Sequence, residues 1–228
     1  MSSSRDTILN KLRSSRRPFV DAPPRPQNYL NVTLQDDTSP EALLTRFTEE
    51  LTKLTGEVYV VDGDDQARSK VLEVLEQFEV KSMLAWDFAN IPVEGLESAI
   101  RATGIEIIHP ETHDEMRMET LTVSAAAQIG LTGADAAAAT TGSLVFTTAP
   151  GKGRIPTVLP PVHLAVITLD QILPRLESWF AVQRAKGLPL TDSANFCFIT
   201  GPSKTGDIEM MTVLGVHGPG KIRVIIKR

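Results

Sequence analysis

The sequence has one cysteine and no long hydrophobic run, and each shortage excludes a class of protein. Cys197 stands alone among 228 residues, so the chain cannot form an internal disulfide, which suits a reducing compartment. One thiolate also cannot hold an iron–sulfur cluster, which needs about four ligands. No apolar run approaches the roughly 18–20 residues that span a bilayer, and no secretory apolar segment follows the first residues. We therefore expect a soluble cytoplasmic protein without a membrane partner.

Basic charge is also scarce in most of the chain. The formal net charge is −5, and residues 1–28 carry net +4, which leaves −9 for the remainder. A protein that binds nucleic acid needs a basic face to neutralise phosphates, so nucleic acid is not expected as a partner. The hydrophobic fraction of 42% is ample for one large core.

The N-terminal segment differs from the rest. The spacing of Ile8 and Leu12 predicts a short amphipathic helix over residues 6–17. Four prolines follow, which lack the N–H of a helix interior and restrict the residue before them: Pro18, Pro23, Pro24 and Pro26. We predict that residues 1–38 form an arm outside a single compact domain of residues 39–228.

The compact part alternates between two kinds of hydrophobic pattern. Ser39-Pro40-Glu41 is a typical helix start, because serine caps, proline has its φ preset and glutamate favours the positive end of the helix dipole. Further helices are predicted at 65–78, 93–102, 113–127 and 170–186. Strands are predicted at 58–61, 82–85, 105–108, 143–147, 164–167, 196–200 and 222–226. This alternation is typical of the α/β class, with a mostly parallel sheet flanked by helices. The alanine run before Thr140-Thr141-Gly142 is interpreted as a turn rather than a helix.

A glycine-rich segment, Thr200–Glu209, is the richest candidate for a binding site. It follows a predicted strand and precedes a predicted helix, and Lys204 can add a positive charge to backbone N–H groups that face an anion. It is not a Walker loop, because Asp207 and Ile208 stand where Lys and Ser or Thr are required. A merely structural turn remains the alternative.

The histidines and loop carboxylates allow further hypotheses. His217 lies between glycines, where it can act as an acid, a base or a hydrogen-bond donor, or only bond its own turn. Asp207 and Glu209 can serve acid–base chemistry or cap a helix. His109 and His113 have the spacing of a metal pair only on a helix, and Pro110 between them argues against a metal site.

Four segments together resemble the lactate-utilisation protein C family, whose domain is called LUD. They are Ile129–Val145, Leu159–His163, Gly201–Glu209 and Leu214–Pro219. Their order and spacing match across roughly residues 40–228. The resemblance implies a fold similar to the ribose-5-phosphate isomerase and coenzyme A transferase group. It also implies a role in oxidising L-lactate to pyruvate, beside partner proteins that carry iron–sulfur centres.

The sequence departs from the family pattern at three positions. Thr140 replaces a common acidic residue, Ser143 a threonine and Gly206 an alanine, and the change at Thr140 weakens the hypothesis of a catalytic carboxylate there. The catalytic glutamate motif of coenzyme A transferases is missing, so transfer chemistry is not implied.

These observations lead to one functional hypothesis and two alternatives. We expect an accessory component of lactate oxidation that binds a small anionic metabolite. One alternative is a free-standing enzyme that acts on a phosphosugar or an acyl-thioester, and the other is a purely structural subunit. No nicotinamide or flavin cofactor is expected, because Val61–Asp65 replaces the glycine motif after the first strand. The ligand and the oligomeric state stay open.

The candidate catalytic residues are His217, Asp207 and Glu209. The candidate ligand-binding residues are Gly133, Asp135, Thr141, Gly142, His163, Gly201, Ser203, Lys204, Thr205, Gly206 and Gly218.

Deleting residues 1–38 tests the predicted arm. We expect the free energy of unfolding of the remainder to stay within ~1 kcal/mol of the full chain, as for a segment with little burial. Thermal or urea unfolding of both chains measures this. A large fall in melting temperature would show that the segment packs on its own subunit or on a neighbour.

Overall fold

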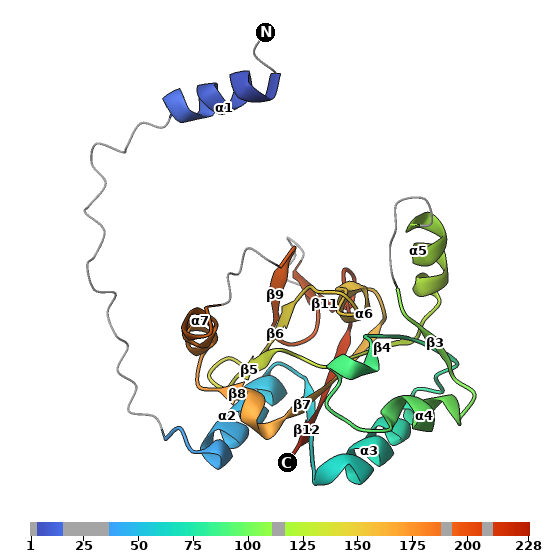
Figure 1. Cartoon of the computed structure of the whole chain (residues 1–228). Helices are drawn as coiled ribbons and strands as arrows, with labels where there is room; N and C mark the ends of the chain where they lie inside the picture. Colours follow the sequence, from blue (N-terminus) through green and yellow to red (C-terminus); the bar gives the residue numbers. More distant parts are fainter. Residues whose placement is uncertain (1–3, 16–36, 111–116, 188–192, 207–211) are drawn as a thin grey trace. The chain divides into compact units, whose positions relative to one another are not determined.

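The computed structural model describes residues 4–15, 37–110, 117–187, 193–206 and 212–228. The chain divides into two parts, residues 1–36 and 37–228, which are described separately. In the first part, helix α1 covers Ser4–Ser15 and exposes both Ile8 and Leu12 (Figure 1). This helix starts two residues earlier than the spacing predicts.

The second part contains six α-helices and two short 3-10 helices among its described residues. They are α2 Pro40–Lys53, α3 Gly63–Gln77, η1 Phe88–Asn90, α4 Leu96–Arg101, α5 Arg117–Ala125, α6 Ile155–Val158, η2 Leu169–Gln171 and α7 Leu176–Ala185. The start of α2 is confirmed, since Ser39 accepts a hydrogen bond from the Ala42 N–H and Pro40 is the first helical residue. No described helix is long and apolar enough to cross a membrane.

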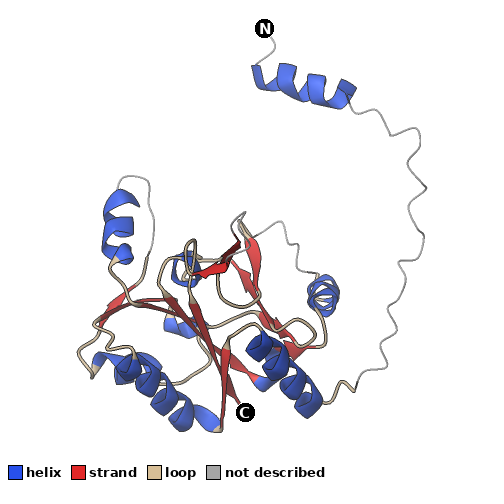
Figure 2. Cartoon of the chain, turned by 180° about the vertical axis from the view of Figure 1, so that it is seen from behind, coloured by secondary structure: helices blue, strands red, loops and turns tan. Residues whose placement is uncertain are grey.

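A six-stranded sheet forms the centre of this part, in the order β1-β12-β7-β4-β2-β3. Every neighbouring pair is parallel. The strands are β1 Glu57–Val61, β2 Ser82–Ala85, β3 Glu106–Ile108, β4 Ile129–Thr132, β7 Val162–Thr168 and β12 Lys221–Lys227. The inner strands are continuous apolar runs because helices or a second sheet cover both faces. The predicted α/β class is confirmed, and Figure 2 shows helices on both sides of the strands.

A second, four-stranded sheet was not predicted. Its order is β8-β5-β6-β9, with β5 Ala136–Ala138, β6 Ser143–Thr147, β8 Ile172–Leu173 and β9 Phe196–Ile199. Strand β6 pairs antiparallel with β5 and β9, and β5 pairs parallel with β8. The alanine run is therefore a fully buried strand, since sheet pairing overrides the helix propensity of alanine. The predicted helix at 170–186 starts only at Leu176, because Ile172 and Leu173 join this sheet.

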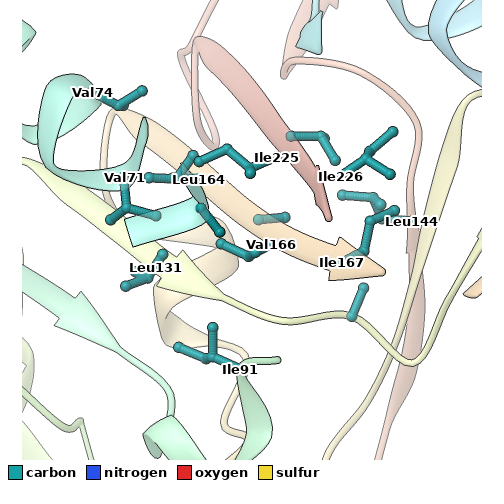
Figure 3. Close-up of a cluster of buried hydrophobic side chains, with 14 of the residues drawn as sticks. Val71, Val74, Ile91, Leu131, Leu144, Leu164, Val166, Ile167, Ile225 and Ile226 are labelled. Carbon is teal, nitrogen blue, oxygen red and sulfur yellow. The ribbon is translucent and has the colours of Figure 1, made fainter. Parts of the chain in front are cut away.

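Different elements pack on the two faces of the central sheet. Helix α3 packs on β1 and β12, and Figure 3 shows Val71 and Val74 of this helix beside Leu164 of β7. Side chains alternate along a strand, so His163 points to the opposite face, where it meets Phe146 of the second sheet. Each sheet thus completes the core of the other.

Two glycines let loop backbones approach helix α2. Gly142 has a φ of +61°, and a Cβ there would lie 2.6 Å from the Leu51 nitrogen. Gly201 has a φ of +79°, and its Cβ would lie 2.8 Å from the Leu54 Cβ. Packing alone accounts for both residues.

The substitution Gly142→Ala tests this close approach. We expect a loss of about 2–4 kcal/mol in the free energy of unfolding, from a left-handed backbone and a backbone clash. Gly206→Ala is the matched control, because nothing lies within 4 Å of a Cβ there, and it should change stability by less than about 0.5 kcal/mol. Urea denaturation measures both, and equal stabilities of the two variants would contradict the packing role of Gly142.

Candidate functional site

Two of the predicted glycine-rich segments lie together at the amino ends of the central strands. The Ser203 N–H donates to the Pro219 carbonyl at 2.8 Å, and the Gly215 N–H donates to the Ser203 carbonyl at 2.9 Å. The Gly220 N–H donates at 3.0 Å to the Pro161 carbonyl, just before β7. Gly218 also lies against Ser203, since a Cβ on it would be 3.3 Å from the Ser203 Cβ. We call residues 201–206 and 215–220 the amino-edge loops.

The chemistry of the amino-edge loops differs from the sequence prediction. Strands β10 Lys204–Gly206 and β11 Thr212–Leu214 pair antiparallel, whereas the sequence indicates a helix after the glycine-rich segment. The N–H groups of Ser203 and Gly215 are used inside the cluster and cannot bind an anion. The side chains of Lys204 and His217 are exposed. Asp207 and Glu209 lie outside the described residues.

The other predicted ligand residues lie elsewhere. Thr141 hydrogen-bonds Ser143 at 2.7 Å, and Ser143 hydrogen-bonds Thr200 at the same distance, close to α2. Gly133 follows β4, and a Cβ on it would lie 2.3 Å from the Asn90 carbonyl oxygen. The residues predicted as one site thus belong to several places in the fold.

His163 is fully buried between the two sheets. Its Nε2 lies 2.9 Å from the Thr132 Oγ1, and its ring centroid lies 5.6 Å from that of Phe146. Nδ1 has no hydrogen-bond partner among the described residues. Burial lowers the pKa of His163 from 6.5 to about 4, so the ring is neutral at neutral pH. His163 is a core residue that a ligand at the surface does not reach.

Asp135 forms an ion pair with Lys152. It also accepts hydrogen bonds from the Thr147 N–H at 2.5 Å and the Thr147 hydroxyl at 2.8 Å. The Lys152 Nζ lies 5.0 Å from the centre of the Trp86 ring. Both charged side chains are mostly buried, so the pair fixes the loop that contains Lys152.

The one cysteine lies near this pair. Cys197 is half-buried opposite Phe146 on the neighbouring strand. The pKa of its thiol is raised above the usual value, mainly by burial. The positive charge of Arg154 opposes this rise, and the negative charge of Asp135 adds to it. A protonated, half-buried thiol fits a packing role better than that of a nucleophile.

A cavity lies at the carboxyl ends of β2 and β3. The next strand of the central sheet after β2 is β3, which lies at one edge of the sheet. The next strand of this sheet after the neighbouring β4 is β7, which lies on the other side, toward the opposite edge. Such a topological switch point is where open α/β sheets bind ligands. The cavity has a volume of about 940 Å³. Trp86 and Phe88 after β2, His109 after β3 and the loop of residues 149–153 contribute to its walls.

The spacing of His109 and His113 indicated at most a metal pair, and no pattern indicated Trp86 or Phe88. A usable signal was present, because all three come within three residues of the end of a predicted strand of a parallel sheet and so lie at the same edge. His113 lies outside the described residues. Among the described residues, no three His, Cys, Asp or Glu side chains are placed to hold a metal ion.

The fold and the cavity define a parallel α/β protein with a ligand-sized cavity at the carboxyl ends of β2 and β3, beside the topological switch point. The sequence profile of the LUD domain matches residues 44–226, and the chain belongs to this family. It is 29% identical over 222 residues to lactate utilization protein C of Halalkalibacterium halodurans, covering 94% of each chain. It is 31% identical to lactate utilization protein C of Macrococcus caseolyticus, over 71% of this chain and 68% of that one.

A solved structure supports the fold. The chain is similar to a DUF162 family protein from Deinococcus radiodurans, with a TM-score of 0.58 and 19% identity, over 83% of this chain and 99% of that one. The resemblance seen in the sequence is thereby confirmed at the level of family and fold.

The pKa of His163 predicts a pH effect on stability. The unfolded chain binds this proton near pH 6.5 and the folded chain only near pH 4, so stability falls as the pH falls through this window, by up to about 3 kcal/mol. In His163→Gln, whose amide can still bond Thr132, the fall between these pH values should be smaller by a similar amount. Urea unfolding at several pH values measures the difference. Parallel pH profiles of the two proteins would contradict a buried neutral His163.

Proposed function

We propose that this chain takes part in lactate utilisation in the cytoplasm, as an accessory component that binds a small anionic metabolite. The observation that carries the proposal is the match to lactate utilization protein C over 94% of both chains. The match extends over nearly the whole length of that relative rather than over one segment of it.

The cysteine count supports the accessory role. Oxidation of lactate to pyruvate releases two electrons, which a redox group has to accept. With Cys197 as the one thiol, this chain does not supply the ligands of an iron–sulfur cluster. We infer that the electrons pass to iron–sulfur partner proteins, as the family resemblance implies.

The amino-edge loops are the proposed anion site. Lys204 and His217 are exposed there, and Lys221 starts the adjoining strand β12. The positive charges of Lys204 and Lys221 favour a carboxylate or a phosphate, in a protein whose formal net charge is −5. The alternative enzyme requires a carboxylate beside His217. Among the described residues His217 has no hydrogen-bonded partner, so no observation favours that alternative.

Deleting the gene tests the physiological role. We expect slow growth on L-lactate and normal growth on glucose, with growth on lactate restored by the wild-type gene. The purified chain should be colourless, because it holds no iron–sulfur or flavin group. Normal growth of the deletion strain on lactate, in the absence of a second related gene, would contradict the proposal.

Lys204→Ala tests the anion site. One charge-assisted contact contributes about 1.5–3 kcal/mol, so the affinity for carboxylate or phosphate compounds should fall by at least about tenfold. Calorimetric titration with L-lactate, pyruvate and inorganic phosphate measures it. Lys53→Ala, at the exposed end of α2, is the matched control. Equal binding by wild type and Lys204→Ala, or no binding by wild type, would make the loops purely structural.

A further inference from the structure

We propose that the cavity at the carboxyl ends of β2 and β3 is a second ligand site, which binds an uncharged flat heterocycle that carries a hydrogen-bond donor. His109 accepts the hydrogen bond and Phe88 supplies a stacking surface. This site is separate from the amino-edge loops and does not depend on the role in lactate utilisation.

The cavity walls are held in place by bonds between distant segments. The Trp86 indole N–H donates to the Gly153 carbonyl at 2.7 Å, and the Asp87 N–H donates to the Gly151 carbonyl at 2.9 Å. The ion pair of Lys152 and Asp135 holds the same loop from its other side. A site with fixed walls does not have to order a loop when a ligand binds.

The orientation of His109 sets what it can recognise. Its Nδ1 lies 3.2 Å from the carbonyl oxygen of Ala85. A carbonyl oxygen can only accept, so the neutral ring carries its proton on Nδ1 and Nε2 has the lone pair. The side chain is exposed at the cavity wall, so Nε2 is available to a donor on a ligand, such as an amino, imide or hydroxyl group.

The remaining wall selects the shape of the ligand. The Phe88 ring lies edge-on to His109, with the ring centroids 6.0 Å apart. Pro110, Pro150 and Pro156 add rigid apolar surface. Aromatic and proline surfaces favour a flat ring, and stacking on such a surface tolerates many heterocycles. The volume of about 940 Å³ leaves room for a molecule of nucleoside size or larger.

The charges of the wall disfavour an anionic ligand. Asp87, Glu97 and Arg101 contribute to the wall, and Arg101 is bound to the Glu97 carboxylate through two nitrogens, at 3.0 and 2.7 Å. The net charge of these groups is −1. Among the described residues that line the cavity, the one cation is paired with a carboxylate, which distinguishes this cavity from the amino-edge loops.

Calorimetric titration of the full chain tests the site. The probes are adenosine, guanosine and uridine, each compared with its 5′-monophosphate. We expect at least one uncharged probe to bind, and its monophosphate to bind no more tightly. No binding by any of the three uncharged probes, or binding that requires the phosphate, would overturn the proposal.

Variants of two wall residues locate the binding. His109→Asn keeps a donor near the Ala85 carbonyl but removes the acceptor at Nε2, and should weaken binding at least about fivefold. His109→Gln places an amide near the Nε2 position and should bind more tightly than His109→Asn. Phe88→Ala should weaken binding at least about fivefold, and Lys53→Ala should leave it unchanged.

The melting temperature of each variant separates lost binding from lost folding. Unchanged affinity in both His109→Asn and Phe88→Ala would place the ligand elsewhere and overturn the proposal. Growth on lactate is a separate readout, so failure of this site leaves the proposed function standing, and the reverse also holds.

Discussion

The insertion of the last strand between β1 and β7 is the constraint on which the rest of the structure depends. Strand β12 pairs with both neighbours, and its Val224, Ile225 and Ile226 are fully inaccessible to solvent. Its nearly buried Arg223 donates to Glu57 of β1 and to Gln77 of α3, so the charge is compensated rather than left in the core. Without β12, strand β1 would have no hydrogen-bonded neighbour in the sheet, and helix α3 would lose part of its packing surface.

Both candidate ligand sites follow from that sheet. At its amino edge, β12 begins directly after the loop of residues 215–220, which packs on Ser203. At its carboxyl edge, the opposite exits of the chain from β2 and β4 leave room for the cavity beside Trp86 and His109. The first site presents exposed positive charge, whereas the second presents aromatic and proline surface, the acceptor Nε2 of His109 and a net negative charge. One rigid sheet therefore presents two surfaces that suit ligands of different chemistry.

The parts of the fold that depend on local pattern were predictable from the sequence. The Ser39-Pro40 start of α2 and the buried runs of β7 and β12 lie where the sequence indicates them. The second sheet was not predictable, because a run of alanines fits both a helix and a buried strand. Only the packing against neighbouring elements decides which of the two forms. Convergence of loops was predictable only in part. The contact between Ser203 and Gly218 was not predicted, because they lie on separate loops. Gly142 and Gly201 serve the packing of α2, and His163 is enclosed by a sheet that the sequence does not reveal.

The central functional claim is that this chain serves lactate oxidation without carrying the electrons itself. Reconstitution measures this most directly, by following the reduction of an artificial electron acceptor by purified iron–sulfur partner proteins supplied with L-lactate, with and without this chain. The account predicts little reduction by the partners alone, none by this chain alone and a clear increase when they are combined. An unchanged rate when this chain is omitted, or lactate oxidation by this chain alone, would contradict it.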